Sequence, residues 1–302
     1  MADKSLTVDR QIALLQHRNV EFEDVEKAKE ILMDIGYYRL GFYFFPFEKT
    51  FPALYQKRKH VMQIGTKFED AVALYYFDFD LRILLLKYTS RIEVAFRTCV
   101  VYNMSNRYDN PCWFVDAGIM SPSFIKDFRN KVYVNIKRNP AIVRHHQLHK
   151  RSKFAPAWKT LEFMTLGEIQ TLFENIIKVD DQLIICKAFH VNKTQVFLNY
   201  IDTVRHLRNI CAHGGVLYEM KLTQAIRKGP AGHFQGIEKN FLYGTLVVAH
   251  FMLEQISENR AQDMWNQVCH LLTDLCQNHP NLQSVIENTM GAKVEDFLKL
   301  QK

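Results

Sequence analysis

A long segment without glycine or proline is the feature that most constrains the fold of this 302-residue chain. Residues 66 to 104 contain neither residue, and Thr66 with Glu69 has the spacing of a helix-capping box. Because glycine and proline interrupt helices most strongly, this segment predicts one long helix or a kinked pair of helices. The sequence shows no convincing alternation of apolar and polar residues of the kind that a half-buried strand requires. We therefore predict an all-α fold.

Apolar residues recur at helical spacing through most of the remaining chain. From Asp24 to Ile35 they keep to one face, and Gly36 then ends the helix. Residues 36 to 47 are rich in aromatic side chains and too irregular to assign. Ser121-Pro122-Ser123 predicts the start of a helix through a basic segment, which Asn139-Pro140 interrupts. Further helices are expected at 166–178, 180–189, 194–213, 216–227, 240–258, 261–277 and 281–300, the last broken near Gly291.

The helical pattern suggests three regions. They are an N-terminal helical and aromatic region (1–60), a helical core (61–228) and a set of C-terminal helices (237–302) that could pack with the core as one domain. The most linker-like stretch is 229–236, which is rich in glycine and proline. The sequence has neither a membrane span nor the apolar core of a signal peptide, so we expect a cytoplasmic protein without membrane contact. Six cysteines without a CxxC pair favour buried free thiols over a metal site.

Positive charge is concentrated in one part of the core. The chain has a net charge of +7, but residues 128 to 161 contain no acidic residue. The basic residues of this segment are Arg129, Lys131, Lys137, Arg138, Arg144, Lys150, Arg151, Lys153 and Lys159. Such a concentration suggests a polyanionic partner, with nucleic acid as the first candidate. A solvated basic face is an equally good interpretation on charge alone.

The segment most suggestive of chemistry is YIDTVRHLRNICAHGG, from Tyr200 to Gly215. On a helix, one side would carry the apolar residues Val196, Tyr200, Val204, Leu207, Ile210 and Cys211. The other side would carry Arg205, Arg208, Asn209, Ala212 and His213. This polar side has no acidic residue to neutralise its arginines, and the small Ala212 leaves room for a ligand. An ordinary solvent-facing side is the alternative, since an arginine five residues before a histidine is common by chance.

RHLRNICAHGG resembles the R-x4-6-H signature of the HEPN ribonuclease superfamily, in the form carried by Abi-like (abortive-infection, AbiD/AbiF-type) proteins. Three further segments resemble blocks of that family in the same order: IGYYRLGFYFFPF, LYYFDFDLRILLLKYTSRIEVAFRT and PAWKTLEFMTLGEIQTLF. The resemblance runs from about Asp9 to Glu219, and the C-terminal third matches no block. One departure is that Gly-Gly follows His213, where many relatives carry polar residues. The resemblance implies a HEPN-like helical bundle with N-terminal and C-terminal helical extensions.

The resemblance also implies an activity, namely metal-independent RNA cleavage in phage defence at a site that two motifs form across a homodimer. No cofactor or metal is expected. Imidazole suits proton transfer and guanidinium suits phosphate binding, which assigns the first role to His213 and the second to Arg208. Asn209 would orient one of them, and Arg205 would anchor the RNA backbone. Relatives of the AbiF type are associated with a small RNA that restrains them.

Other residues have expected roles around this centre. RNA contacts in the basic segment are expected at Lys137, Arg138, Arg144, Lys150, Arg151 and Lys153. We interpret His145, His146 and His149 as part of an RNA-contacting loop, because the basic residues beside them would repel a metal cation. Glu162 is either an acid supporting the site or an ordinary surface residue, and the acids and arginines of residues 78–97 suggest a structural ion-pair network. Two alternative functions remain: RNA binding without cleavage, and assembly through the same helix.

Overall fold

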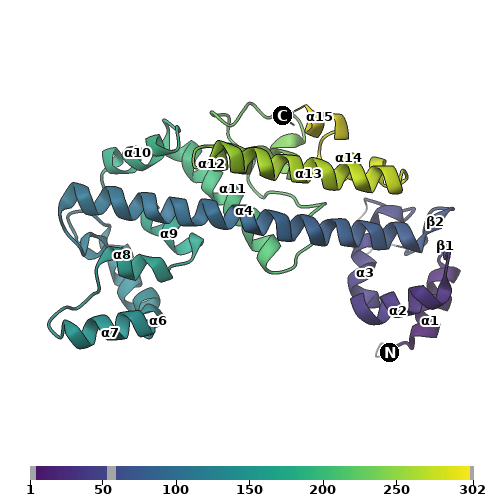
Figure 1. The fold of residues 1–302 in the computed structure, drawn as a ribbon, viewed down its shortest axis with the longest axis horizontal. Coiled ribbons are helices and arrows are strands. Elements are labelled where there is room, and N and C mark those ends of the chain that lie inside the picture. Colours follow the sequence, from purple (N-terminus) through teal and green to yellow (C-terminus); the bar gives the residue numbers. More distant parts are fainter. Residues whose placement is uncertain (1–4, 53–58, 300–302) are drawn as a thin grey trace.

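The structure, a computed structural model, describes residues 5–52 and 59–299, and its helices confirm the all-α prediction. One long helix, α4 (Phe68–Tyr108), runs through most of an elongated molecule (Figure 1). The strands in the described part of the chain are β1 (Val20–Glu21) and β2 (Thr66–Lys67), which pair in parallel at one end of α4. These two short strands were not predicted.

The start of α4 differs from the predicted capping box. Thr66 belongs to β2, and its hydroxyl donates to the carbonyl oxygen of Gln63 at 2.7 Å. The carboxylate of Glu69 accepts from the backbone N–H of Glu23 at 3.1 Å, so neither side chain caps the helix. The prediction was wrong because pairing with Val20 holds Thr66 in an extended conformation outside the helix.

The N-terminal region packs against the first part of α4. Its helices are α1 (Val8–His17), α2 (Val25–Ile35), α3 (Tyr37–Phe44) and the 3₁₀ turn η1 (Phe45–Phe47). The predicted helix after Asp24 is confirmed: the Asp24 carboxylate accepts from the backbone N–H of Lys27, and Gly36 with φ +87° follows the last residue. The unassigned aromatic residues 36–47 form α3 and η1, whose buried rings contact α4. Helix α1 had not been predicted.

A group of short helices surrounds the other end of α4. They are η3 (Trp113–Val115), α5 (Pro122–Asp127), the π-helical turn η4 (Phe128–Val132), α6 (Tyr133–Ile136), α7 (Pro140–Leu148), α8 (Ala157–Thr160), η5 (Leu161–Phe163), α9 (Leu166–Glu174) and α10 (Val179–Ala188). Ser121 caps α5, as its spacing predicts, by accepting from the backbone N–H of Phe124. The predicted interruption at Asn139-Pro140 is also confirmed, because Asn139 caps a new helix there.

Helix α11 (Thr194–Ala212) lies along α4, and the chain returns over it before the last helices. The helix predicted at 216–227 is absent: these described residues form turns and extended backbone. Side chains on other elements bind this backbone instead. Asp78 accepts from two of its N–H groups, and the Asn199 amide donates to Ala225 O at 3.1 Å and accepts from Arg227 N at 2.8 Å. These bonds replace those that a helix would form.

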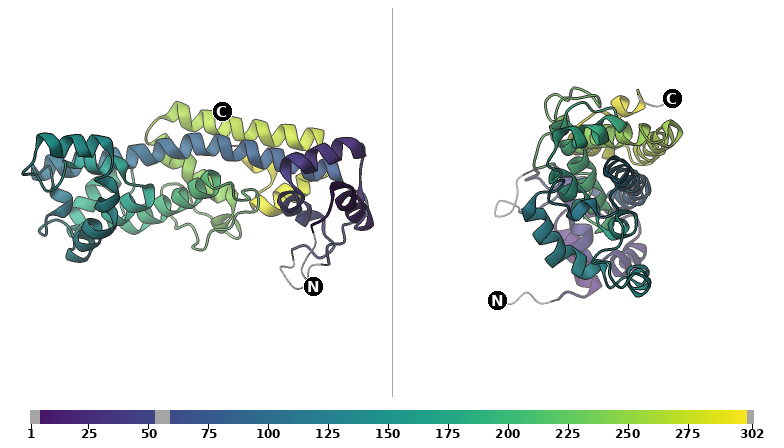
Figure 2. Two further views of the ribbon diagram at one scale, coloured as in Figure 1. Left: turned by 90° about the horizontal axis from the view of Figure 1, so that it is seen from below. Right: turned by 90° about the vertical axis from the view of Figure 1, so that its left-hand side faces the viewer.

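The C-terminal part of the chain also packs on α4, where α13 covers the side away from α11. It contains η6 (Glu238–Asn240), α12 (Leu242–Glu254), α13 (Glu258–Asn278), α14 (Leu282–Met290) and α15 (Val294–Leu298). Gly291, with φ +85°, separates the last two helices, which confirms the predicted break. Figure 2 shows α13 running alongside α4, where the amide of Gln267 donates to the Tyr88 hydroxyl at 2.7 Å.

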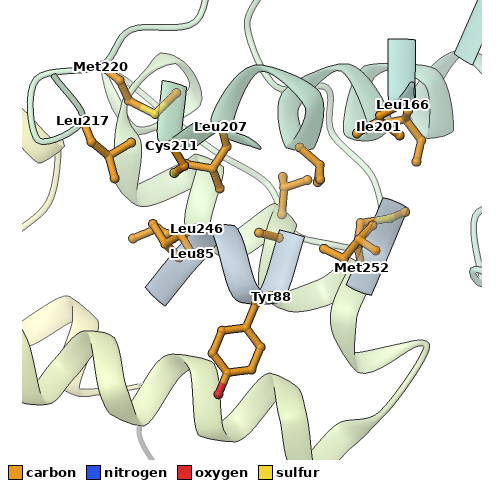
Figure 3. Packing of buried hydrophobic residues seen from close by; sticks show 14 of the residues in the cluster. Leu85, Tyr88, Leu166, Ile201, Leu207, Cys211, Leu217, Met220, Leu246 and Met252 are labelled. Carbon is orange, nitrogen blue, oxygen red and sulfur yellow. The ribbon is translucent and has the colours of Figure 1, made fainter. Parts of the chain in front are cut away.

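One hydrophobic core connects α4, α11 and α12. Leu207 and Cys211 project from α11 toward Leu85 of α4 and Leu246 of α12 (Figure 3). The linker-like stretch also joins this core, because the Tyr200 hydroxyl accepts from the backbone N–H of Ala231 at 3.3 Å. Within residues 5–52 and 59–299, no helix is long and apolar enough to cross a membrane.

Candidate active site

Helix α11 presents the Arg-x4-His motif (Arg208 to His213) in the orientation that its sequence predicts. The residues expected on the apolar side are buried, except Ile210, which is partly exposed. His213 lies immediately after the helix, and its backbone N–H donates to Asn209 O at 3.0 Å. Gly214 follows with φ +66°, a conformation that glycine adopts at little cost and that turns the chain away from the helix axis. His213 is an exposed side chain at the end of a helix whose apolar side is buried.

A buried ion pair on α4 fixes the backbone that follows His213. The carboxylate of Asp78 pairs with Arg82 and accepts from the backbone N–H groups of Leu217 at 2.9 Å and Tyr218 at 2.6 Å. The Arg82 guanidinium also donates to the carbonyl oxygen of Gly215 at 3.0 Å. These interactions fix the chain that follows the turn, and α11 fixes the residues before it, which limits the movement of His213.

Arg208 is held by an acid from a different helix. Its Nε lies 3.3 Å from the Glu93 carboxylate of α4, and its Nη1 lies 3.4 Å from the side-chain oxygen of Asn209. Arg205 pairs with Asp202 and donates from Nε to Gln170 at 2.9 Å. The expectation that no acid neutralises these arginines was wrong, because Glu93 comes from a distant part of the chain and Asp202 turns toward Arg205. The Arg208 side chain keeps 30% of its surface exposed, so it can still reach a ligand.

Glu93 connects Arg208 to a second arginine. The Arg97 guanidinium lies 2.9 Å from Glu93, donates to the carbonyl oxygen of Met164 at 2.9 Å and lies 3.8 Å from the carboxylate of Glu162. The pairs predicted along α4 are present, but Glu93 and Arg97 also belong to the surroundings of the motif. Glu162 lies at the edge of this cluster. The Arg-x4-His motif alone could not predict that Glu93 belongs to the site. Two signals pointed to it: it lies in the second segment that resembles the family, and it is four residues before Arg97.

A single chain does not bring Arg208 and His213 into contact. Within the described residues, the His213 side chain forms no hydrogen bond or ion pair. Arg208, Asn209 and Glu93 form one group, and His213 projects separately at the helix end. This separation agrees with their angular spacing of about 140° on a helix with 100° per residue.

The basic segment is exposed but lies away from the motif. The expected RNA contacts Lys137, Arg138, Arg144, Lys150, Arg151 and Lys153 are all exposed. None of these six forms an ion pair with another described residue. They follow α6 or lie on and after α7, which Figure 1 places at one end of the molecule, whereas α11 lies near its middle. The structure therefore does not gather them with Arg208 and His213.

The three histidines of this segment lie on and just after α7, so the expected loop was wrong. His145 is buried, and its two ring nitrogens have no hydrogen-bond partner among the described residues. Burial together with the charge of His149 lowers the pKa of His145. His146 is 2.7 Å from the Tyr133 hydroxyl, and only His149 is fully exposed. Within the described residues, no group of three or more His, Cys, Asp or Glu side chains is placed to hold a metal ion.

The helices that form the candidate site, α4, α8, α9 and α11, lie within the part of the chain that a known family covers. A family model described as Abi-like protein matches residues 30–219, more than half of the chain. The chain belongs to the Abi-like protein family. No curated protein and no solved structure matches it.

The family match contains the whole candidate site of this Abi-like protein. It includes Glu93, Arg97, Arg208 and His213, and it ends at the residue after Tyr218, whose N–H binds Asp78. The helices from α12 onward lie outside the match, but α12 and α13 pack on the same long helix. Membership of the family indicates abortive infection as the broad role.

Proposed function

We propose that this Abi-like protein is a metal-independent endoribonuclease of the HEPN type that acts in abortive-infection defence against phage. The main support is the arrangement of Arg208 beside Glu93 and Asn209, with an exposed His213 on a fixed turn five residues later. A histidine held this way can transfer protons, and the arginine keeps donors free for a phosphate. Restraint by a small RNA, as in AbiF-type relatives, belongs to the same proposal.

The reaction needs only these groups. A base removes the proton of the ribose 2′-OH, the 2′-oxygen forms a bond to phosphorus, and the bond from phosphorus to the 5′-oxygen breaks. The leaving 5′-oxygen takes up a proton, which gives a 2′,3′-cyclic phosphate and a 5′-OH end. We assign proton transfer to His213 and stabilisation of the phosphorane charge to Arg208. DNA lacks the attacking hydroxyl and should resist cleavage.

An exposed apolar stripe on α4 supports the homodimer that such a site requires. Its residues are Tyr76, Phe79, Ile83, Val94 and Tyr102, all on one face of the helix. In an antiparallel pair of α4 helices centred near residue 85, Tyr76 would face Val94 of the second copy, and Asp80 would face Arg91. This pairing matches one apolar contact and one pair of opposite charges across the two-fold axis. The two-fold axis of this dimer is perpendicular to the plane that contains both α4 helices. Rotation about it leaves each α11 on the same side of that plane, so both copies of Arg208 would lie on one side of the dimer.

A charge exchange tests this dimer. Asp80→Arg should shift the protein toward the monomer in light scattering, because the new arginine would face Arg91 of the second copy. The double variant Asp80→Arg/Arg91→Asp should restore the dimer, since the opposite charges then meet again. Both residues are exposed, so the fold should be unaffected. A wild-type monomer at micromolar concentration, with and without RNA, would count against the composite site.

The decisive experiment for the activity is cleavage of a short RNA and its DNA counterpart with EDTA present. His213→Ala should lower the rate by about 10² to 10⁴, the usual contribution of a general acid–base group. Its exposed position means that stability should change little. Leu207→Ala is the control, since it should destabilise the core by about 2–5 kcal/mol without a chemical defect. If His213→Ala cuts RNA as fast as wild type, RNA binding without cleavage becomes the better proposal, with assembly alone the next alternative.

A further inference from the structure

Trp158 on α8 differs from the other two tryptophans of the chain. Trp113 and Trp265 are fully buried, and their indole N–H groups donate to Ser105 at 3.2 Å and Phe297 O at 2.8 Å. Trp158 is 55% exposed, and it forms no hydrogen bond or ring contact with another described residue. Burying such a large ring is favourable, so an exposed indole marks a surface that a ligand can cover.

The turn that carries Trp158 is held firmly. The N–H of the preceding Ala157 donates to the carbonyl oxygen of Pro111 at 2.7 Å, and the Thr160 hydroxyl donates to the carbonyl oxygen of Ala155 at 2.7 Å. Ala157, Thr160 and Leu161 are all buried. The ring is therefore presented from a fixed scaffold, which lowers the entropy lost when a ligand stacks on it.

The surroundings of Trp158 indicate the chemistry of its ligand. A second exposed ring, Phe163, lies at the end of η5, five residues later. Lys153 and Lys159 are exposed nearby in the chain, inside the segment that has no acidic residue. Phe163 follows the exposed acid Glu162, whereas Trp158 lies between Lys153 and Lys159 in the chain. A flat apolar ring among positive charges fits a strand whose bases are unpaired and whose phosphates are negative.

We propose that Trp158 is a stacking platform for the unpaired bases of single-stranded RNA. This inference rests on the proposed function, because it concerns how the same substrate is held. The turn is linked to the motif through Arg97, which contacts Glu162 and Met164 O on this side and shares Glu93 with Arg208 on the other. A strand stacked on Trp158 would lie at the end of the basic segment, from which Glu162 and Arg97 lead to the motif.

The test measures binding separately from cleavage. The probe is a labelled single-stranded oligouridine with 2′-O-methyl groups, which cannot be cut. An abasic strand of equal length (the baseless strand) measures the contribution of phosphate contacts alone. Trp158→Ala should weaken oligouridine binding by about 5- to 150-fold, the usual range for loss of one base–aromatic stack. Binding of the baseless strand should be unchanged. Trp158→Phe should keep most of the affinity, because a stacking ring remains.

Intrinsic fluorescence adds a second measurement. Since Trp158 is the exposed tryptophan of the three, oligouridine should quench the wild-type emission and leave that of Trp158→Phe almost unchanged. Tyr38→Ala removes a ring that is 82% exposed on α3 and serves as the matched control, with unchanged RNA affinity.

Three results would overturn the platform. They are full oligouridine affinity in Trp158→Ala, equal wild-type affinity for the baseless strand, and a change of oligomeric state in Trp158→Ala, which would indicate a protein contact. Because the probe cannot be cut, binding is measured independently of cleavage. A platform without nuclease activity would bind oligouridine through Trp158 but cut no RNA, and a nuclease without the platform would cut RNA and bind equally well in Trp158→Ala.

Discussion

At the scale of single residues, Glu93 is the side chain on which the arrangement of the site depends most. It pairs with the buried Arg97 and with the partly exposed Arg208. One carboxylate thereby stabilises a structural arginine and orients a functional one. Such shared pairing fixes the guanidinium of Arg208, while its other donors stay available to a ligand, which under the proposed function is an RNA phosphate.

Glu93→Gln should therefore affect both stability and catalysis. Loss of the charge leaves Arg97 buried with weaker partners, and we expect the free energy of unfolding in urea to fall by about 1–3 kcal/mol. RNA cleavage should also fall, because Arg208 is less well oriented. Glu162→Gln is the matched control: this carboxylate is 62% exposed and 3.8 Å from Arg97, so its loss should cost about 0–1 kcal/mol. An equal or larger cost for Glu162→Gln would contradict this role of Glu93.

At the scale of elements, the path of the chain after α11 is set by α4 rather than by its own sequence. Gly214 and Gly215 permit the turn, but Asp78 and Arg82 bind the backbone that follows it. The same bonds explain why residues 216–227 do not continue as a helix. A buried acid from a distant element supplies acceptors that local hydrogen bonds would otherwise provide.

Asp78→Asn should release this segment. The variant loses the ion pair with Arg82 and weakens two hydrogen bonds to backbone N–H groups, which should cost about 3–5 kcal/mol because Arg82 stays buried. Hydrogen exchange at the amides of Leu217 and Tyr218 should accelerate, and RNA cleavage should fall with the loss of a fixed His213. Asp180→Asn, a change of the same type at an exposed site on α10, should leave all three measurements nearly unchanged. Unaltered protection of the two amides in Asp78→Asn would show that the turn does not need this carboxylate.

At the scale of the whole molecule, the exposed basic surface and the motif lie at different points along the length of α4. Short helices with exposed basic residues surround one end of α4, and the motif lies on α11, which packs near the middle of the molecule (Figure 1). A strand of RNA that reaches both surfaces must extend along α4. Affinity and chemistry should therefore be separable by mutation.

Lys150→Gln, Arg151→Gln and Lys153→Gln together should weaken RNA binding and leave the melting temperature unchanged, because all three side chains are exposed and outside any described ion pair. Each lost phosphate contact should reduce the slope of log affinity against log salt by about one unit at most. The matched variant replaces Lys126, Lys187 and Lys193, which are exposed elsewhere, with glutamine. Equal effects of the two triple variants would mean that only net charge matters, and full affinity at low salt would reduce the segment to a solvated surface.

The sequence by itself determined the all-α fold, most helix positions, the buried side of α11 and the exposed positions of the basic segment. These features follow from local periodicity and from glycine and proline, which act over a few residues. Tertiary structure alone decided the partners of the polar side of α11 and the path of residues 216–227. Glu93 reaches Arg208, and Asp78 reaches Leu217, across more than 100 residues of chain. No local pattern encodes such pairs, because they depend on how whole helices pack.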